Sequence, residues 1–175
     1  LFMKILHISN FVQKHNGRLY WNHAFKINNG FIRNGHSVYN YSDRDVSRSN
    51  ILNKFTDNYY TQINLLETFK NYDPDFIVIG HADKIVNSTL KKMKDIKKSL
   101  KIIEWNVDNF FLDNTEEKLK KRSDIVDGIF TTNADERIAN CAKSNNFIAF
   151  FPNIFDQSIE NLKIFENTEF IYDLF

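Results

Sequence analysis

The chain has 175 residues, of which 42% are hydrophobic and 15% aromatic, including 17 Phe. This composition supplies a sizeable core for one compact domain and excludes intrinsic disorder. Its 23 Lys and Arg against 22 Asp and Glu give a formal net charge of +1, so attraction to a polyanion such as nucleic acid is not indicated.

The cysteine content and the first apolar run bear on the compartment. Cys141 is the single cysteine, which excludes an internal disulfide and suits a reducing compartment. His7 interrupts the apolar run of residues 5–8, so this run predicts a first strand and not a signal peptide. No stretch approaches the roughly 20 apolar residues that a membrane-spanning helix requires. We therefore expect a cytoplasmic protein, for which peripheral association with a membrane surface stays open.

Six short runs rich in Ile, Val and Phe alternate with longer segments of helical character. They cover residues 4–9, 37–41, 75–80, 101–107, 128–132 and 147–151. Such alternation is typical of βα units around a parallel sheet whose two faces are covered. The sequence therefore predicts an α/β fold, a Rossmann-like three-layer domain with a mainly parallel sheet of about six strands.

The segments between the runs carry apolar residues at helical spacing. In the first, Ala24, Ile27 and Phe31 recur three and four residues apart before Gly35. The second repeats the pattern before Pro74, and the third combines an apolar stripe with a lysine run that we interpret as a solvated face.

A further helix is expected after the fifth run. Asn133 followed by Glu136 predicts a capped helix start, in which Cys141 is a core residue and not a nucleophile. From residue 154 the pattern changes: residues 154–167 suit a linker helix, and residues 170–175 resume as a strand. We therefore expect one domain over residues 1–153, with residues 154–175 forming a linker and the first strand of a second, truncated domain.

Ligands of open parallel sheets bind outside the carboxyl ends of the strands, so the loops after the runs are the expected site. The first loop holds Asn10, Gly17 and Arg18, and its glycine would let backbone N–H groups approach an anion or a sugar. A flexible loop with a turn glycine is the equal alternative. After the second run, residues 42–45 carry mixed charges that either bind hydroxyls or pair with each other in solvent, and we favour the solvent-exposed pairs.

The third and fourth runs end in the best candidates for chemistry. His81 suits a base near neutral pH, with a helix cap before Ala82 as the alternative. The fourth run places polar residues where a buried strand is normally apolar, which is typical of function. Asp108 suits orienting an acceptor hydroxyl or taking its proton. Trp105 either stacks on a sugar ring or fills the core, and Glu104 is either paired with a basic neighbour or exposed at an edge.

Several common sites are absent from the sequence. It contains no GxGxxG or GxxxxGK[ST] phosphate cradle, no HExxH or Cys-His spacing, and no GxSxG elbow. Neither a nucleotide cofactor nor a metal site is therefore predicted.

Three segments together resemble the amino-terminal domain of GT-B glycosyltransferases. They are MKILHIS at residues 3–9, NGFIRNGHSV at residues 29–38 and FPN at residues 151–153. Residues 130–133, FTTN, resemble the family's strand before a short helix near the interdomain cleft. Residues 171–175, IYDLF, resemble the first strand of the second domain in family 1 or CgeB-like enzymes.

The resemblance implies the acceptor-side half of an enzyme that transfers a sugar from a nucleotide-sugar donor to a glycan or lipid-linked saccharide, as in cell-envelope polysaccharide biosynthesis. It implies no tightly bound metal, a donor held mainly by the second domain, and inactivity of this half alone. The candidate catalytic residues are His81 and Asp108. The candidate substrate-binding residues are Asn10, Gly17, Arg18, Trp105 and Asn153.

Three alternatives remain open at this point. The first is a nucleotide-sugar 2-epimerase, which shares the two-domain architecture. The second is a flavodoxin-like or receiver-like binding module, and the third is an interaction domain. Neither of these two would have a catalytic role. Receiver domains need acidic residues after the first strand, where Ser9 and Asn10 stand instead. For the glycosyltransferase, we expect one cleft lined by Asn10, Gly17, Arg18, His81 and Asp108.

Overall fold

The sheet is the centre of the molecule. The structure, a computed structural model, describes residues 2–111, 114–143 and 145–161, so the predicted strand at 170–175 lies outside the described residues. The strands are β1 (Lys4–Ser9), β2 (Ser37–Ser42), β3 (Phe76–Gly80), β4 (Lys101–Asn106), β5 (Gly128–Thr131) and β6 (Phe147–Phe150). Each lies within one residue of a predicted run.

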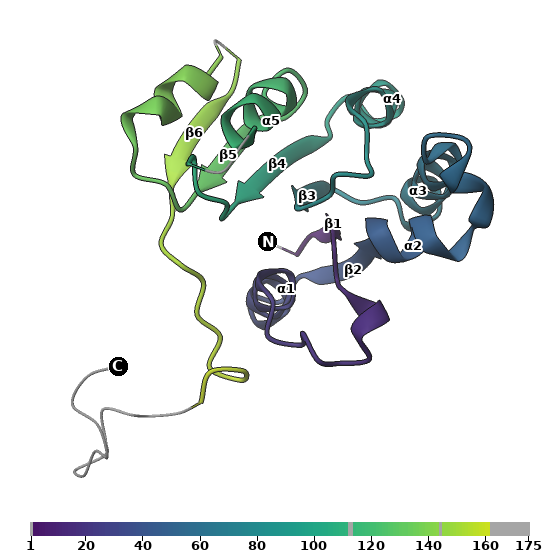
Figure 1. Ribbon diagram of the computed structural model, residues 1–175, viewed down its shortest axis with the longest axis horizontal. Coiled ribbons are helices and arrows are strands. Elements are labelled where there is room, and N and C mark those ends of the chain that lie inside the picture. The colour runs from purple at the N-terminus through teal and green to yellow at the C-terminus, as the bar shows by residue number, and fades with distance from the viewer. Residues whose placement is uncertain (1, 112–113, 144, 162–175) are drawn as a thin grey trace.

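All neighbouring strands pair in parallel, in the order β2-β1-β3-β4-β5-β6. Helices cover both faces of this sheet (Figure 1). The prediction of an α/β, Rossmann-like domain with a six-stranded parallel sheet is therefore confirmed.

The helices divide unequally between the two faces. The α-helices are α1 (His23–Arg33), α2 (Asp43–Ser49), α3 (Tyr59–Tyr72), α4 (Asn87–Ile96) and α5 (Thr115–Arg122), and short 3-10 turns are η1 (Gln13–His15), η2 (Ile51–Lys54) and η3 (Glu136–Cys141). Helix α1 covers one face, and α3, α4 and α5 cover the other (Figure 1). Within the part of the chain that the structure describes, no helix has the length and apolar character to cross a bilayer.

Two apolar clusters fill the space between the sheet and its helices. The larger one includes Leu65 and Phe69 of α3, Leu90 of α4 and Leu119 of α5. Cys141 belongs to this cluster and is 1% exposed, as expected for a core residue, and burial raises the pKa of its thiol. The smaller cluster packs α1 against β1, β3 and β4.

The predicted helix after the fifth strand is wrong in type and in its cap. The segment forms the 3-10 turn η3, and Asp135 Oδ1 accepts the hydrogen bond from the backbone N–H of Arg137. Asn133 does not cap it, because its side chain bonds elsewhere.

A buried hydrogen-bonded network crosses the α1 side of the sheet. The indole N–H of Trp105 donates to His7 Nε2 at 3.0 Å, so the His7 hydrogen is on Nδ1 and is donated to Asn28 Oδ1. Asn28 Nδ2 in turn donates to Asn40 Oδ1. Burial lowers the pKa of His7 to about 4, which keeps the ring neutral and the network complete.

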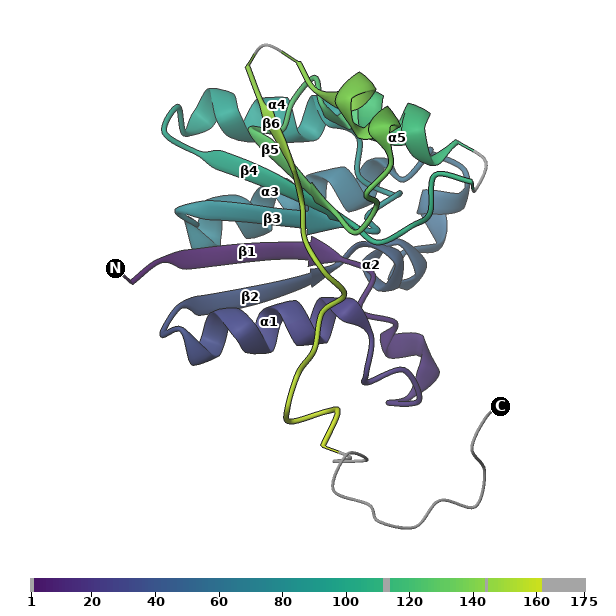
Figure 2. The same ribbon diagram turned by 90° about the vertical axis from the view of Figure 1, so that its left-hand side faces the viewer.

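Residues 151–161 lead away from β6 and cross α1 (Figure 2). Arg33 Nη2 donates to Asp156 Oδ1 at 2.7 Å, and Lys26 forms an ion pair with Glu160. Residues 157–159 form a turn, and no helix forms over residues 154–161. The predicted linker helix is therefore wrong over these residues. Residues 162–167 of that prediction lie outside the described residues.

Candidate functional site

The strand order places a topological switch point between β1 and β3. The chain passes from β1 to β2 on one side, and β3 then pairs on the other side of β1, so the loops after β1 and β3 diverge. Open α/β sheets bind ligands in the crevice that this divergence creates. A cavity of about 190 Å³, here named the switch-point cavity, lies at this position. Its lining includes Asn10, Asn22, His23, Arg44, His81 and Trp105.

A second cavity lies beside the carboxyl end of β4. It has a volume of about 410 Å³ and is here named the β4 cavity. Its lining includes His81, Glu104, Asn106, Asp108, Lys118 and Lys121. His81 and Arg44 line both cavities, so they form a wall shared by the two.

His81 is held in an uncommon backbone conformation directly after β3. Its φ is +50°, in the left-handed region that non-glycine residues rarely adopt and that often marks functional positions. Its ring packs edge-on against Trp105, with centroids 4.9 Å apart. The helix-cap alternative is wrong, because no helix begins at Ala82 and α4 starts at Asn87.

The structure brings His81 and Asp108 together. His81 Nδ1 lies 3.6 Å from Asp108 Oδ2, within ion-pair range and slightly beyond a direct hydrogen bond. Burial lowers the pKa of His81, and the Asp108 carboxylate opposes this shift. His81 is therefore neutral near pH 7, the form that accepts a proton, with a carboxylate beside it to stabilise the imidazolium that results.

Asn133 fixes the loop that carries Asp108. Its Nδ2 donates to the backbone oxygen of Asp108 at 2.8 Å, and its Oδ1 accepts from the N–H of Phe110 at 3.2 Å. Thr131 Oγ1 accepts a further bond from the same amide at 2.9 Å. Asn133 is thus a positioning residue, which the sequence pattern had indicated only as a helix cap.

The Trp105 side chain packs between β3 and β4. It is 4% exposed, so of the two alternatives for this residue the indole fills the core. A Cβ atom at Gly80 would lie 2.2 Å from Trp105 Cε2, so the glycine lets the indole pack against β3. One edge of Trp105 also lines the switch-point cavity.

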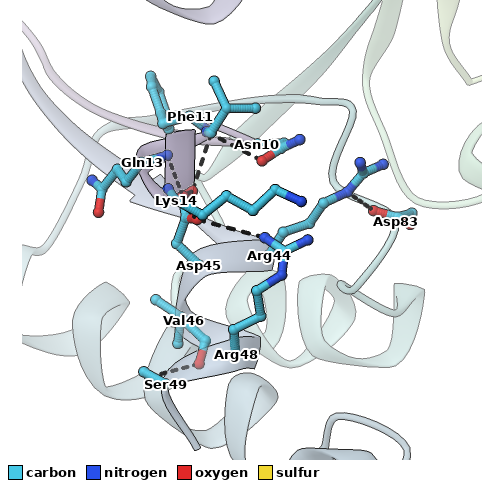
Figure 3. A network of polar contacts seen from close by, with 12 residues as sticks. Asn10, Phe11, Gln13, Lys14, Arg44, Asp45, Val46, Arg48, Ser49 and Asp83 are labelled. Carbon is cyan, nitrogen blue, oxygen red and sulfur yellow. Dashed lines mark hydrogen bonds and ion pairs between the residues drawn. The ribbon is translucent and has the colours of Figure 1, made fainter. Parts of the chain in front are cut away.

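The segment at residues 42–45 anchors the first loop, as Figure 3 shows for Asp45. Asp45 Oδ2 accepts from the N–H of Gln13 at 2.9 Å, and Ser42 Oγ accepts from the N–H of Phe11 at 3.1 Å. The expected solvent exposure is wrong for Ser42 and Asp43, which are both buried. These residues turn the chain into α2 and tie it to the loop after β1.

The two charged neighbours in that segment reach the loop after β3. Asp43 Oδ2 accepts from the N–H of Lys84 at 3.1 Å, and burial raises the pKa of Asp43 to about 6. Arg44 Nε donates to Asp83 Oδ1 at 2.8 Å (Figure 3). These contacts from α2 therefore hold the loop after β3, which forms part of the wall shared by the two cavities.

The remaining candidates lie apart from the two cavities. Gly17 and Arg18 follow η1 on an exposed part of the first loop, and Gly17 has a φ of +83° that suits a turn. Asn153 is exposed after β6. None of these three residues lines either cavity, whereas Asn10 lines the switch-point cavity and Asp108 the β4 cavity.

Sequence reasoning missed His23, Arg44 and the role of Glu104. His23 is the first residue of α1, and helix starts in βα units point to the carboxyl edge of the sheet, a signal present in the sequence. Glu104 Oε2 lies 3.8 Å from Arg122 Nε, which favours the paired alternative. Burial raises the pKa of Glu104 to about 7, and Arg122 offsets part of this effect.

Neither a metal site among the described residues nor a known relative identifies the function of this chain. In the described ranges, no group of three or more His, Cys, Asp or Glu side chains is placed to hold a metal ion. Comparison with known protein families, curated proteins and solved structures finds no match to this chain.

Proposed function

We propose that this chain is the acceptor-side domain of a GT-B glycosyltransferase. The observation that carries the proposal is the pairing of His81 with Asp108 at the carboxyl edge of the sheet, on a wall shared by two cavities. A neutral imidazole beside a carboxylate is the arrangement that a base for hydroxyl activation requires.

The positions of the matching segments support the proposal. Residues 3–9 contain β1, residues 29–38 join α1 to β2, and residues 151–153 follow β6. Ser9 lines the switch-point cavity, and its buried Oγ has no hydrogen-bond partner among the described residues. Tyr20, Trp21 and Phe111 are exposed on the loops that precede α1 and follow β4, and they offer aromatic faces for sugar rings.

In the proposed reaction, an acceptor hydroxyl attacks the anomeric carbon of the nucleotide sugar. A new carbon–oxygen bond forms there, and the bond to the nucleotide breaks with its electron pair leaving on the nucleotide phosphate. His81 takes the hydroxyl proton, and Asp108 orients the ring and stabilises its positive charge.

The donor belongs to a second domain in this proposal. Holding donor and acceptor together contributes roughly 7–11 kcal/mol of barrier reduction, which one half of a cleft does not supply. We therefore expect residues 1–175 alone to bind nucleotide sugars weakly and to transfer no sugar. Tight nucleotide-sugar binding by this chain in a calorimetric titration would overturn that domain assignment.

The test of the reaction uses the full-length product of the gene that encodes this chain. It is incubated with a panel of nucleotide sugars and saccharide acceptors, and transfer is followed by mass spectrometry. His81→Ala should reduce turnover by roughly 10²–10⁴-fold while leaving the folded state intact, because it removes the base. Asp108→Asn should reduce turnover less.

His15→Ala is the matched control, since His15 lies in η1 and lines neither cavity. Its turnover should equal that of the unmodified enzyme. Full transfer by both the His81 and Asp108 variants would exclude the assigned base, and absence of transfer from every donor would reject the glycosyltransferase proposal.

The strand order favours one second candidate. The order β2-β1-β3-β4-β5 is also that of flavodoxin-like sheets, which bind a flavin nucleotide at the same switch point. Titration with FMN, followed by flavin fluorescence, separates the two: stoichiometric quenching supports the flavodoxin-like module, and unchanged fluorescence supports the glycosyltransferase.

A further inference from the structure

Strand β4 carries a row of hydrogen-bond acceptors on the face that points to α5. Glu104 and Asn106 are two residues apart in the strand and therefore share a face, and Asp108 follows where β4 has ended. All three line the β4 cavity. The intervening Trp105 belongs to the opposite face, where it packs in the cluster beneath α1.

Two oxygen atoms in this row lack a hydrogen-bond donor, although the Glu104 carboxyl lies within ion-pair range of Arg122. Within the described residues, no hydrogen-bond donor reaches Glu104 Oε2 or Asn106 Oδ1, and both atoms are buried. Arg122 does not satisfy Glu104, because its Nε stays 3.8 Å away while its Nη1 and Nη2 donate to Asn87 Oδ1 and the Ile85 backbone oxygen. Unpaired buried polar atoms are costly, so native sites usually supply them with a partner.

Cations stand at the edge of the same cavity. Lys118 and Lys121 of α5 are exposed and line it, and neither forms an ion pair with another described residue. The two arginines of the lining are already engaged: Arg44 is paired with Asp83 at 2.8 Å, and Arg122 donates to Asn87 and to the Ile85 backbone oxygen. The cavity therefore combines inner acceptors that need hydroxyl donors with outer lysines that favour an anion.

We propose that the β4 cavity binds a saccharide that carries an anionic group, with its hydroxyls donating to Glu104 and Asn106 and its anion facing Lys118 and Lys121. The volume of about 410 Å³ falls within the range of small-molecule sites. His81 and Asp108 border the same space, which brings a hydroxyl of this saccharide to the proposed base.

This inference rests on the proposed function only in naming the saccharide as the acceptor. Binding is measured with this chain alone, without donor and without transfer, so the two proposals fail separately. Binding of the acidic saccharide by an enzyme that transfers no sugar would reject the function and keep the site.

The experiment is a calorimetric titration of the chain with four probes: glucuronic acid, glucose 6-phosphate, glucose and inorganic phosphate. At least one of the two acidic sugars should bind roughly tenfold more tightly than glucose and than phosphate, since each of the latter engages half of the cavity. The acidic sugar that binds more tightly identifies the anion as carboxylate or phosphate. If inorganic phosphate binds as tightly as the acidic sugars, the cavity is only an anion site and the proposal is overturned.

Variants locate the binding. Glu104→Gln replaces a carboxylate oxygen by an amide N–H and should weaken the acidic sugar and glucose alike, by roughly tenfold. The double variant Lys118→Gln/Lys121→Gln should weaken the acidic sugars and leave glucose unchanged. Lys98→Gln is the matched control, because Lys98 is exposed after α4 and pairs with Asp95 outside the cavity.

Amide NMR spectra of each variant verify that the fold is retained. If Glu104→Gln is poorly folded, Asn106→Asp replaces it. This variant adds a negative charge to the cavity and should weaken the binding of the acidic sugars more than that of glucose. Acidic-sugar affinity that stays unchanged in these variants, or absence of binding by every probe, would overturn the proposal.

Discussion

The two faces of β4 differ in how their polar side chains are hydrogen-bonded. On the face toward α1, Trp105 donates to His7, and the chain of hydrogen bonds continues through Asn28 to Asn40. On the face toward α5, Glu104 and Asn106 present buried oxygens without a described partner. A complete polar network fixes a scaffold, whereas an incomplete one beside a cavity is suited to a ligand. The strand therefore supports the site with one face and forms it with the other.

The largest expected effect comes from breaking the complete side. Trp105→Ala should destabilise the domain by about 3–5 kcal/mol, because it removes a buried indole and leaves His7 Nε2 without its donor. Urea unfolding measures this change. Trp21→Ala is the control, since Trp21 is 51% exposed and should change stability by about 0.5 kcal/mol or less. Equal effects of the two substitutions would contradict the scaffold role of Trp105.

The incomplete side should respond to pH in the opposite sense from an ordinary carboxylate. The folded pKa of Glu104 is raised from 4.5 to about 7, so the folded state favours its protonated form. The stability that this provides is present below pH 4.5 and is lost as the pH rises through 7, by roughly 3 kcal/mol in all. Glu104→Gln should therefore gain stability relative to the unmodified chain between pH 4.5 and pH 8.

Unfolding curves at several pH values test this difference, with Glu117→Gln on the exposed side of α5 as the control. Parallel pH profiles for Glu104→Gln and the unmodified chain would show that Glu104 is not held in a site that disfavours its charge.

A smaller effect is expected where β3 meets Trp105. Gly80→Ala would place a methyl group 2.2 Å from Trp105 Cε2, so the indole or the strand must shift, at a cost of about 1–3 kcal/mol. Gly30→Ala is the control, because its Cβ would meet open space within α1 and should stabilise the helix by about 0.5–1 kcal/mol. Thermal melts of both variants should shift in opposite directions, and a neutral Gly80→Ala would argue against tight packing at this contact.

The sequence predicted the sheet well and the short polar helices poorly. Most of the strands are short runs rich in Ile, Val and Phe, so the sequence pattern marks their limits within one residue. Helix α5, TEEKLKKR, has Leu119 as its one buried apolar residue, and α2, DRDVSRS, buries Asp43 instead. Neither shows helical periodicity, because tertiary contacts and not an apolar stripe hold them in place.

The site was predicted where it depends on strand ends and missed where it depends on pairing at a distance. His81 and Asp108 follow parallel strands, so a shared edge was expected for them. The proximity of Glu104 to Arg122 joins residues from β4 and α5, which no local pattern reveals. Gly17 and Arg18 lie away from the cavities because η1 and its turn carry the first loop outward.

The most direct test of the contrast between the two faces of β4 is an NMR titration of this chain with glucuronic acid. The account predicts chemical-shift changes at the amide groups of Glu104, Asn106 and Asp108 and at the imidazole of His81. The imidazole of His7 and the side-chain amide of Asn28 should keep their shifts, because they are already bonded to each other and to Trp105 and Asn40. Shifts concentrated in the His7 network, or no shifts at millimolar glucuronic acid, would contradict it.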